Sequence, residues 1–146
     1  MILVSACLMG IDCKYNGGNN KIEILNELLK DETLIPVCPE QLGGLKTPRN
    51  PSEIIMIDGN HHVVDKKGND VTLQFIKGAE ETLKIAKIYS IKKAILKSRS
   101  PSCGSKKVYD GTFSGNLVEG EGITAAFLRS NNIKVFNEIN YLEKLK

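Results

Sequence analysis

The chain has 146 residues, of which 41% are hydrophobic and 25% are charged, and this composition excludes a disordered protein. The length suits one core, so we predict a single domain over residues 1–146. The net charge of +3, the lack of Trp and the presence of only four Tyr and four Phe argue against a surface built to bind nucleic acid.

Two apolar runs in the first part of the chain each end at a cysteine. Residues 2–6 precede Cys7 and residues 34–37 precede Cys38, and both runs predict strands. Between them, after a glycine-rich loop, apolar residues recur at helical spacing and predict an amphipathic helix over about residues 20–30. The order strand, helix, strand is typical of a parallel α/β unit.

The middle of the chain contains a hairpin signal followed by a long helix. An Asp-Gly pair lies between two short apolar runs, which predicts a β-hairpin within residues 54–65. Asp70 is the predicted N-cap of a helix that continues to about residue 88. Residues 93–97 form another apolar run and predict a third core strand, which ends shortly before Cys103.

The last third of the chain begins with a polar, glycine-rich segment. We predict a long loop over residues 106–122, with room for a short hairpin. The remaining segments predict a helix, a strand and a helix, over residues 124–131, 133–136 and 139–145. The whole pattern predicts a small three-layer, Rossmann-like parallel sheet with flanking helices and a small β-hairpin.

The cellular compartment decides how the four cysteines are interpreted. No apolar run approaches the ~20 residues of a membrane-spanning helix, and the first residues lack the basic region of a signal peptide. We therefore expect a cytoplasmic protein, in which the cysteines are free, catalytic or metal-bound rather than paired in disulfides.

Three cysteines follow three predicted strands. Cys7, Cys38 and Cys103 come at or just beyond the ends of the first three strands. Because ligands bind outside the carboxyl ends of parallel strands, these thiols are expected to converge at one edge of the sheet. Thiolates bind soft metals and iron–sulfur clusters. The alternative is that they are buried small hydrophobic residues, because no CxxC spacing marks a metal site.

A cluster held by only three thiolates would leave one iron open as a Lewis acid for a substrate sulfur. Glu40, two residues after Cys38, is then a candidate general acid or base. Ser100, three residues before Cys103, is a candidate hydroxyl at the substrate. Cys13 would close the cluster if it were a fourth ligand, and the sequence leaves that open.

A second group of candidates concerns anion binding. Gly17 and Gly18 precede the predicted helix at residues 20–30, so their amides could bind a phosphate, with Lys14 and Arg49 adding charge. A tight turn explains the two glycines equally well. We expect the adjacent histidines at positions 61 and 62 to lie in a solvated hairpin turn rather than to bind a metal together.

Several motifs resemble one bacterial and archaeal family, long known only as a domain of unknown function, which includes thiouracil desulfidase. They are VSACLMG (residues 4–10), KYNGG (14–18), PVCPEQLGGLKTPR (36–49), SPSCG (100–104), YDGTFSG (109–115) and GEGITAAFLRSNNIKVFNE (120–138). They occur in order over nearly the whole chain. Met9, Lys14 and Lys46 depart from the family pattern, and Cys13 stands where valine is common.

The resemblance implies a [4Fe–4S] cluster with one open iron, held by Cys7, Cys38 and Cys103, with Glu40 and Ser100 assisting the reaction. It implies the removal of sulfur from a thiolated uracil without net redox change, in which water supplies oxygen and hydrogen sulfide leaves. The expected partner is a free base, nucleoside or nucleotide. Two alternatives remain open at this point: a cluster-binding sensor or carrier without catalysis, and a desulfidase that acts on thiolated tRNA.

Overall fold

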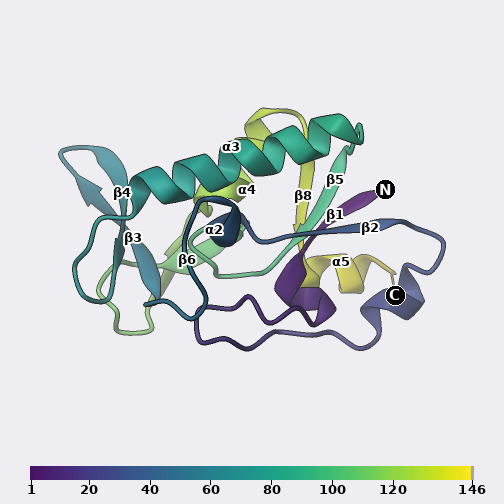
Figure 1. The fold of residues 1–146 in the computed structure, drawn as a ribbon, viewed down its shortest axis with the longest axis horizontal. Helices are drawn as coiled ribbons and strands as arrows, with labels where there is room; N and C mark the ends of the chain where they lie inside the picture. The colour runs from purple at the N-terminus through teal and green to yellow at the C-terminus, as the bar shows by residue number, and fades with distance from the viewer. Residues whose placement is uncertain (146) are drawn as a thin grey trace.

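A four-stranded parallel sheet forms the centre of the molecule in the computed structural model, which describes residues 1–145 (Figure 1). In spatial order its strands are β2 (Leu34–Val37), β1 (Ile2–Ser5), β5 (Lys93–Leu96) and β8 (Lys134–Asn137). The register pairs Leu3 with Ile35 on one side and with Ala94 on the other. The central strand β1 is buried along its whole length, as its continuous apolar sequence requires.

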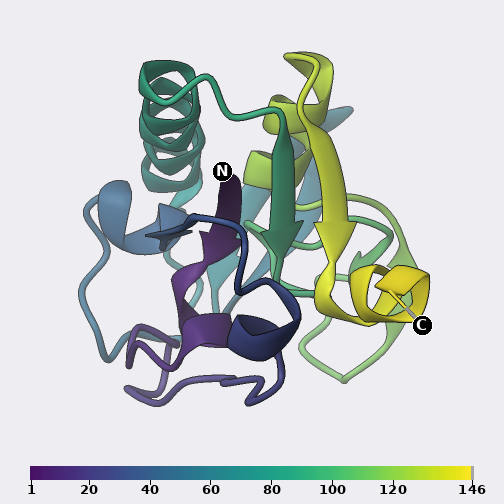
Figure 2. The same cartoon turned by 90° about the vertical axis from the view of Figure 1, so that its right-hand side faces the viewer.

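Helices cover both faces of this sheet, as Figure 2 shows. The long helix α3 (Thr72–Ile88) and α4 (Ile123–Ser130) pack on one face, where Leu83, Leu96 and Leu128 belong to one buried cluster. On the other face lie the short helices η1 (Ala6–Met9) and α1 (Leu25–Leu28) together with α5 (Glu138–Leu145). The predicted three-layer α/β fold is therefore confirmed.

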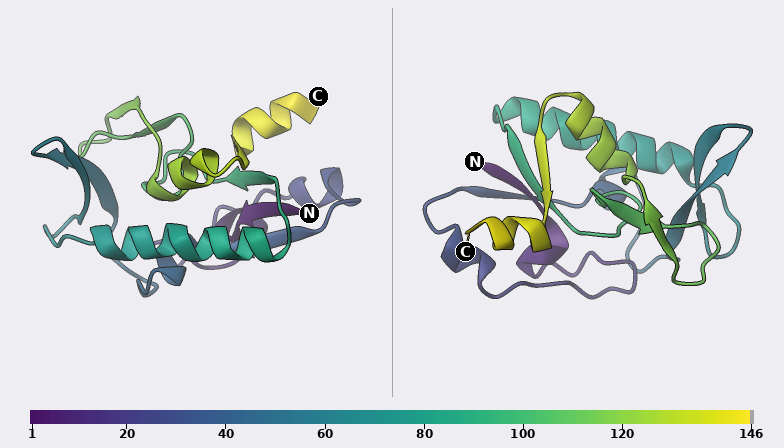
Figure 3. Two further views of the ribbon diagram at one scale, coloured as in Figure 1. Left: turned by 90° about the horizontal axis from the view of Figure 1, so that it is seen from above. Right: turned by 180° about the vertical axis from the view of Figure 1, so that it is seen from behind.

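Two antiparallel hairpins lie together at the end of the molecule away from both termini (Figure 3). The first consists of β3 (Ser52–Ile57) and β4 (Asn60–Asp65), and the second of β6 (Lys107–Tyr109) and β7 (Leu117–Glu119). Asp58 and Gly59 both have positive φ, which is the geometry that an Asp-Gly hairpin turn requires. Both predicted hairpins are confirmed.

The helix predicted over residues 20–30 is wrong in extent, because α1 has only four residues. The backbone N–H groups of Asn20 and Ile22 donate to the carbonyls of Cys7 and Leu8 instead of entering a helix. These bonds hold the segment extended along η1. The first strand also ends one residue early, at Ser5, so that Cys7 lies within η1.

Asp70 was predicted to be the N-cap of α3, and it instead stabilises the helix from one residue before the N-cap. Val71 occupies the N-cap position, and the Asp70 carboxylate accepts the N–H of Thr72, the first helical residue, at 2.9 Å.

The histidines at 61 and 62 lie in β4 rather than in the turn, and His62 Nδ1 is 3.0 Å from Asp70 Oδ2.

Two glycines bring α3 against the short helix α2 (Pro39–Leu42), which follows β2. A Cβ on Gly78 of α3 would overlap the carbonyl oxygen of Pro39, and a Cβ on Gly43 would overlap that of Gln74. The two backbones therefore touch without side chains between them. Among residues 1–145, no helix has both the length and the apolar character that crossing a membrane requires.

Candidate active site

A cavity of about 530 Å³ lies at the carboxyl end of the sheet. Ser5, Val37 and Lys97, which end or follow β1, β2 and β5, line it. Residues of both hairpins line it as well. The location is the one expected for a ligand site in an open parallel sheet.

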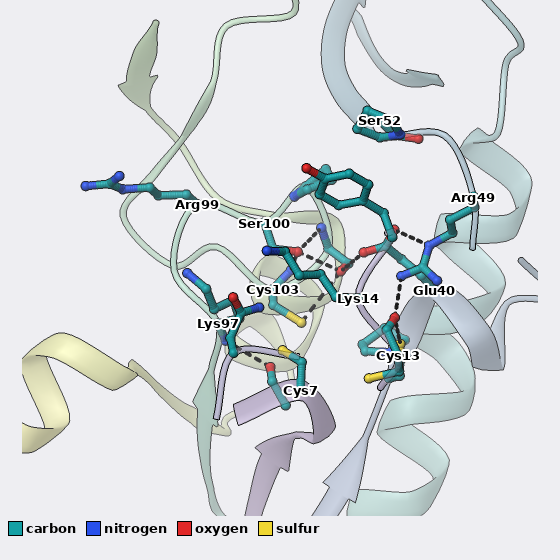
Figure 4. A pocket seen from close by; sticks show the side chains of 18 of the residues that line it. Cys7, Cys13, Lys14, Glu40, Arg49, Ser52, Lys97, Arg99, Ser100 and Cys103 are labelled. Carbon is teal, nitrogen blue, oxygen red and sulfur yellow. Dashed lines mark hydrogen bonds and ion pairs between the residues drawn. The ribbon is translucent and has the colours of Figure 1, made fainter. Parts of the chain in front are cut away.

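All four cysteines line this cavity, and none forms a disulfide. Cys7 comes from η1, Cys38 directly follows β2, and Cys103 lies in the loop after β5. In Figure 4 the side chains of Cys7 and Cys103 point toward one another. The structure thus brings together the three thiols that the sequence places at strand ends.

The environment of Cys103 and Cys7 opposes the ionisation of these two thiols. Burial raises the pKa of Cys103 to about 12, and burial together with the neighbouring Cys38 raises the pKa of Cys7. The neighbouring Cys13 thiol lowers the pKa of Cys38 to about 7, and Cys38 in turn raises the pKa of Cys13. The Cys38 thiol donates to the carbonyl oxygen of Cys13 at 3.9 Å. A cationic iron group would offset the charge of three gathered thiolates, so the donor set suits one.

Glu40 is held by a hydrogen bond at each carboxylate oxygen. Arg49 Nε donates to Oε1 at 3.1 Å, and Ser102 Oγ donates to Oε2 at 3.1 Å (Figure 4). The side chains of Glu40 and Arg49 are only 15% and 8% exposed, so this ion pair is shielded from solvent. Arg49 also donates to the carbonyl of Cys13, which ties the loop carrying that thiol to Glu40.

Ser102 connects the two predicted catalytic residues, and sequence reasoning missed it. Its hydroxyl lies 3.0 Å from Ser100 Oγ, bonds Glu40, and lies 3.6 Å from Cys103 Sγ. Ser100 Oγ in turn accepts the N–H groups of Ser102 and Cys103. Since Ser102 has one hydroxyl proton and gives it to Glu40, Ser100 donates to Ser102. The only available signal was its place beside Cys103.

The four residues predicted to bind an anion separate in the structure. Lys14 and Arg49 line the cavity, whereas Gly17 and Gly18 do not. The two glycines close a turn, in which Gly17 N–H donates to the Lys14 carbonyl and Lys14 N–H to that of Gly18. Their amides do not begin a helix, because α1 starts only at Leu25.

Two more cations line the cavity together with Lys14. These are Lys66, which follows β4, and Arg99, in the loop before Cys103. Neither they nor Lys14 form an ion pair within residues 1–145, whereas Arg49 and Lys97 are paired with Glu40 and Glu138. Within the same residues, no three His, Cys, Asp or Glu side chains are arranged to hold a single metal ion.

Comparison with known proteins places this chain in a family. The model of the 2-thiouracil desulfurase family matches residues 2–140. The chain belongs to this family. Its motifs had predicted this membership, which is therefore confirmed.

Two relatives extend the comparison. The uncharacterized protein YbbK of Bacillus subtilis (strain 168) is 44% identical over 144 residues, which cover 94% of this chain and 95% of that protein. A solved structure of the [4Fe-4S]-dependent thiouracil desulfidase TudS is 42% identical, with a TM-score of 0.88 over 97% of this chain and 93% of that one. The α/β fold of the family is thus also the fold of this chain.

Proposed function

We propose that this protein is a [4Fe–4S]-dependent desulfidase that converts a thiolated uracil compound to its uracil form and releases hydrogen sulfide. One observation carries the proposal: three thiols from three separate elements line one cavity with a carboxylate held on both oxygens. Membership of the 2-thiouracil desulfurase family and the similarity to TudS support it.

Cys7, Cys38 and Cys103 would hold the cluster. With three protein ligands, a bound cluster supplies one open iron, a soft Lewis acid for the thiocarbonyl sulfur. Cys13 is a supporting residue rather than a ligand in this proposal, because its carbonyl oxygen accepts hydrogen bonds from Cys38 Sγ and from Arg49 and so connects the two.

Glu40 would move the protons that the reaction requires. Hydrolysis of a thiocarbonyl transfers both protons of the water to the departing sulfur, which leaves as hydrogen sulfide, so one group that accepts and donates a proton twice per turnover suffices. Arg49 fixes the orientation of the carboxylate. The hydroxyls of Ser100 and Ser102 form a chain of hydrogen bonds that ends at the Glu40 carboxylate, and a proton can pass along it from Ser100 to Glu40.

The substrate side of the cavity would accept a base, nucleoside or nucleotide. Three cations that line the cavity have no acidic partner in the described chain: Lys14, Lys66 and Arg99. The phosphate of a nucleotide would be such a partner. Arg49 contributes to Glu40 rather than to the phosphate, and Gly17 and Gly18 act through the turn that presents Lys14. Free thiols and an open iron suit the reducing cytoplasm.

The test is anaerobic reconstitution with iron and sulfide, followed by mixing with 2-thiouracil, 4-thiouracil and their nucleotides. We expect about four irons per chain, as the cluster composition requires, together with loss of the thiocarbonyl absorbance and release of sulfide. A cluster without turnover on any thiolated uracil compound would identify a sensor or carrier. Turnover only on thiolated tRNA, with salt-sensitive binding, would identify the tRNA substrate instead.

A further inference from the structure

The second hairpin forms part of the cavity although it lies outside the sheet that carries the thiols. Its loop, residues 110–116, joins β6 to β7 and is called the wall loop here. Phe113 and Gly115 of the wall loop and Tyr109 just before it line the cavity. An aromatic ring in such a position can stack on a flat pyrimidine, whatever the exocyclic atoms of the base are.

The tip of the wall loop is stabilised mainly by its own side chains. Asp110 accepts the N–H and the hydroxyl of Thr112, and the Asp110 N–H donates to the carbonyl of Asn116 at 3.0 Å. These bonds define the shape of the loop but do not fix its position relative to the cavity. Phe113 adopts a φ of 55°, which a non-glycine residue holds only when its surroundings impose it.

Glu53 on β3 supplies that constraint. Its Oε1 accepts the backbone N–H of Gly111 at 3.0 Å and that of Phe113 at 3.1 Å. Glu53 is 9% exposed and forms no ion pair within residues 1–145. The two backbone N–H groups, rather than a cation, therefore stabilise its carboxylate. Hydrogen bonds to an ionised acceptor are about twice as strong as neutral ones.

Gly111 shows how closely the wall loop approaches β3. Its φ is 91°, and a Cβ there would lie 2.8 Å from the carbonyl oxygen of Ile54 and 2.6 Å from Cγ2 of Ile55. Only a glycine fits this approach. The loop is therefore held by backbone contact and by one carboxylate, both provided by β3.

We propose that Glu53 is a positioning residue whose carboxylate holds the wall loop against β3, so that Phe113 forms a fixed wall of the cavity for the pyrimidine ring. The inference rests on the proposed function for the identity of the ring. Glu53 itself does not exchange protons with the substrate in this scheme. Its effect is on binding, and it acts through two amides.

The experiment compares E53A, E53Q and G111A with the wild-type holoenzyme and with E80A, an exposed glutamate on α3 that serves as the matched control. Amide hydrogen exchange measures how well the amides of the wall loop are protected. Titration calorimetry measures the affinity of the cavity for uracil, which is not turned over. Losing two charge-assisted bonds in E53A is expected to speed exchange at Gly111 and Phe113 at least about tenfold and to weaken uracil binding about tenfold. E53Q, which keeps the Oε1 acceptor, is expected to fall between E53A and wild type.

G111A tests the same geometry without changing the carboxylate, and it is expected to weaken uracil binding like E53A while the iron content stays at the wild-type level. Unchanged exchange in E53A would overturn the inference, and so would a loss of kcat with unchanged uracil affinity, since that would place Glu53 in the chemistry. Wild-type protein that does not bind uracil would overturn it too. Wild-type protein that binds uracil but releases no sulfide would refute the proposed reaction while leaving this inference supported.

Discussion

The parallel sheet and the two hairpins contribute different chemistry to the same cavity. The sheet, with the short helices and loops that follow its strands, supplies the thiols and Glu40. The hairpins supply Glu53, Lys66, Tyr109 and, in the wall loop, Phe113. Under the proposed function, one part of the molecule would provide the groups that react, and the other would provide the surface that selects the substrate.

The two parts also differ in how they are stabilised. The sheet is enclosed by two large buried clusters, one on each face. The first hairpin is attached through a small third cluster, whose buried members are Val63, Val71 and Phe75. Local damage at the hairpins should therefore change substrate selection, whereas damage at the sheet edge should abolish the reaction. The following predictions test that division.

The largest effect is expected for a change at the sheet edge. C103A should lose the cluster, since two thiolates remain, and iron after reconstitution should fall from about four per chain to near zero. C13A is the matched control and should keep its iron. Iron and sulfide analysis with the visible spectrum measures both, and a loss of iron in C13A would make Cys13 a ligand.

The next effect is expected for a change that impairs catalysis but leaves the cluster bound. E40Q should retain iron and substrate affinity but lower kcat by about 10²- to 10⁴-fold, the usual contribution of a general acid or base. R49K should lower kcat less, because a lysine can keep the charge but not the fixed orientation. Steady-state kinetics decides this, and an E40Q enzyme of normal kcat would remove Glu40 from the mechanism.

A core substitution should separate the hairpin from the sheet. F75A removes the largest buried side chain of the third cluster and should cost about 3–5 kcal/mol in the free energy of unfolding. Urea denaturation measures the cost. If the division holds, the folded variant still binds four irons at low temperature but binds uracil weakly, whereas equal losses of both would contradict it.

A smaller effect is expected at the rim of the cavity. K66A should raise KM about two- to fivefold for a thiouridine monophosphate, since an exposed charge contributes about 1 kcal/mol or less. KM for the free base should not change. Added salt should reduce the difference between wild type and K66A, and an equal change for base and nucleotide would refute a phosphate contact.

The smallest effect is a pH dependence at the start of α3. The hydroxyl and N–H of Thr72, followed by His62, lower the pKa of Asp70 from 3.8 to about 2. A lowered carboxyl pKa gives stability that is present above the unfolded pKa and is lost as pH falls through about 2. D70A should therefore melt below wild type at pH 7, and the difference should shrink in acid. D31A, another exposed aspartate, serves as the control.

Local sequence patterns predicted the sheet because its strands are short and mostly apolar, and the two central strands β1 and β5 are almost wholly buried. The same regularity placed Cys7, Cys38 and Cys103 at one edge, as the cavity shows. The helix over residues 20–30 was predicted too long because its apolar spacing is real, but the backbone of Asn20 and Ile22 finds partners in η1. Hydrogen bonds between the backbone and a distant segment compete with helix formation, and the spacing of apolar residues in the sequence does not reveal them.

The parts of the site that depend on contacts between distant residues were not predictable. Ser102 and Glu40 are 62 positions apart, and Glu53 and Phe113 are 60 apart. Nothing in the residues themselves shows that such pairs meet, and Arg49 was assigned to an anion although Glu40 occupies it. Sequence motifs identified most of the predicted residues that line the cavity, and only the fold shows which of them hold the others in place.

The contact between Gly78 and Pro39 has a consequence for how this protein can be altered. Glu40 follows Pro39 directly, and Pro39 packs against Gly78 of the 17-residue helix α3. The position of α3 therefore determines how far the Glu40 carboxylate lies from the sheet. The inner side of α3 at Gly78 therefore admits no larger residue without lifting Glu40 away from Ser102. Its outer side, where Leu73 and Ile88 are exposed, can be redesigned for solubility or for attachment to a surface without shifting the reacting groups.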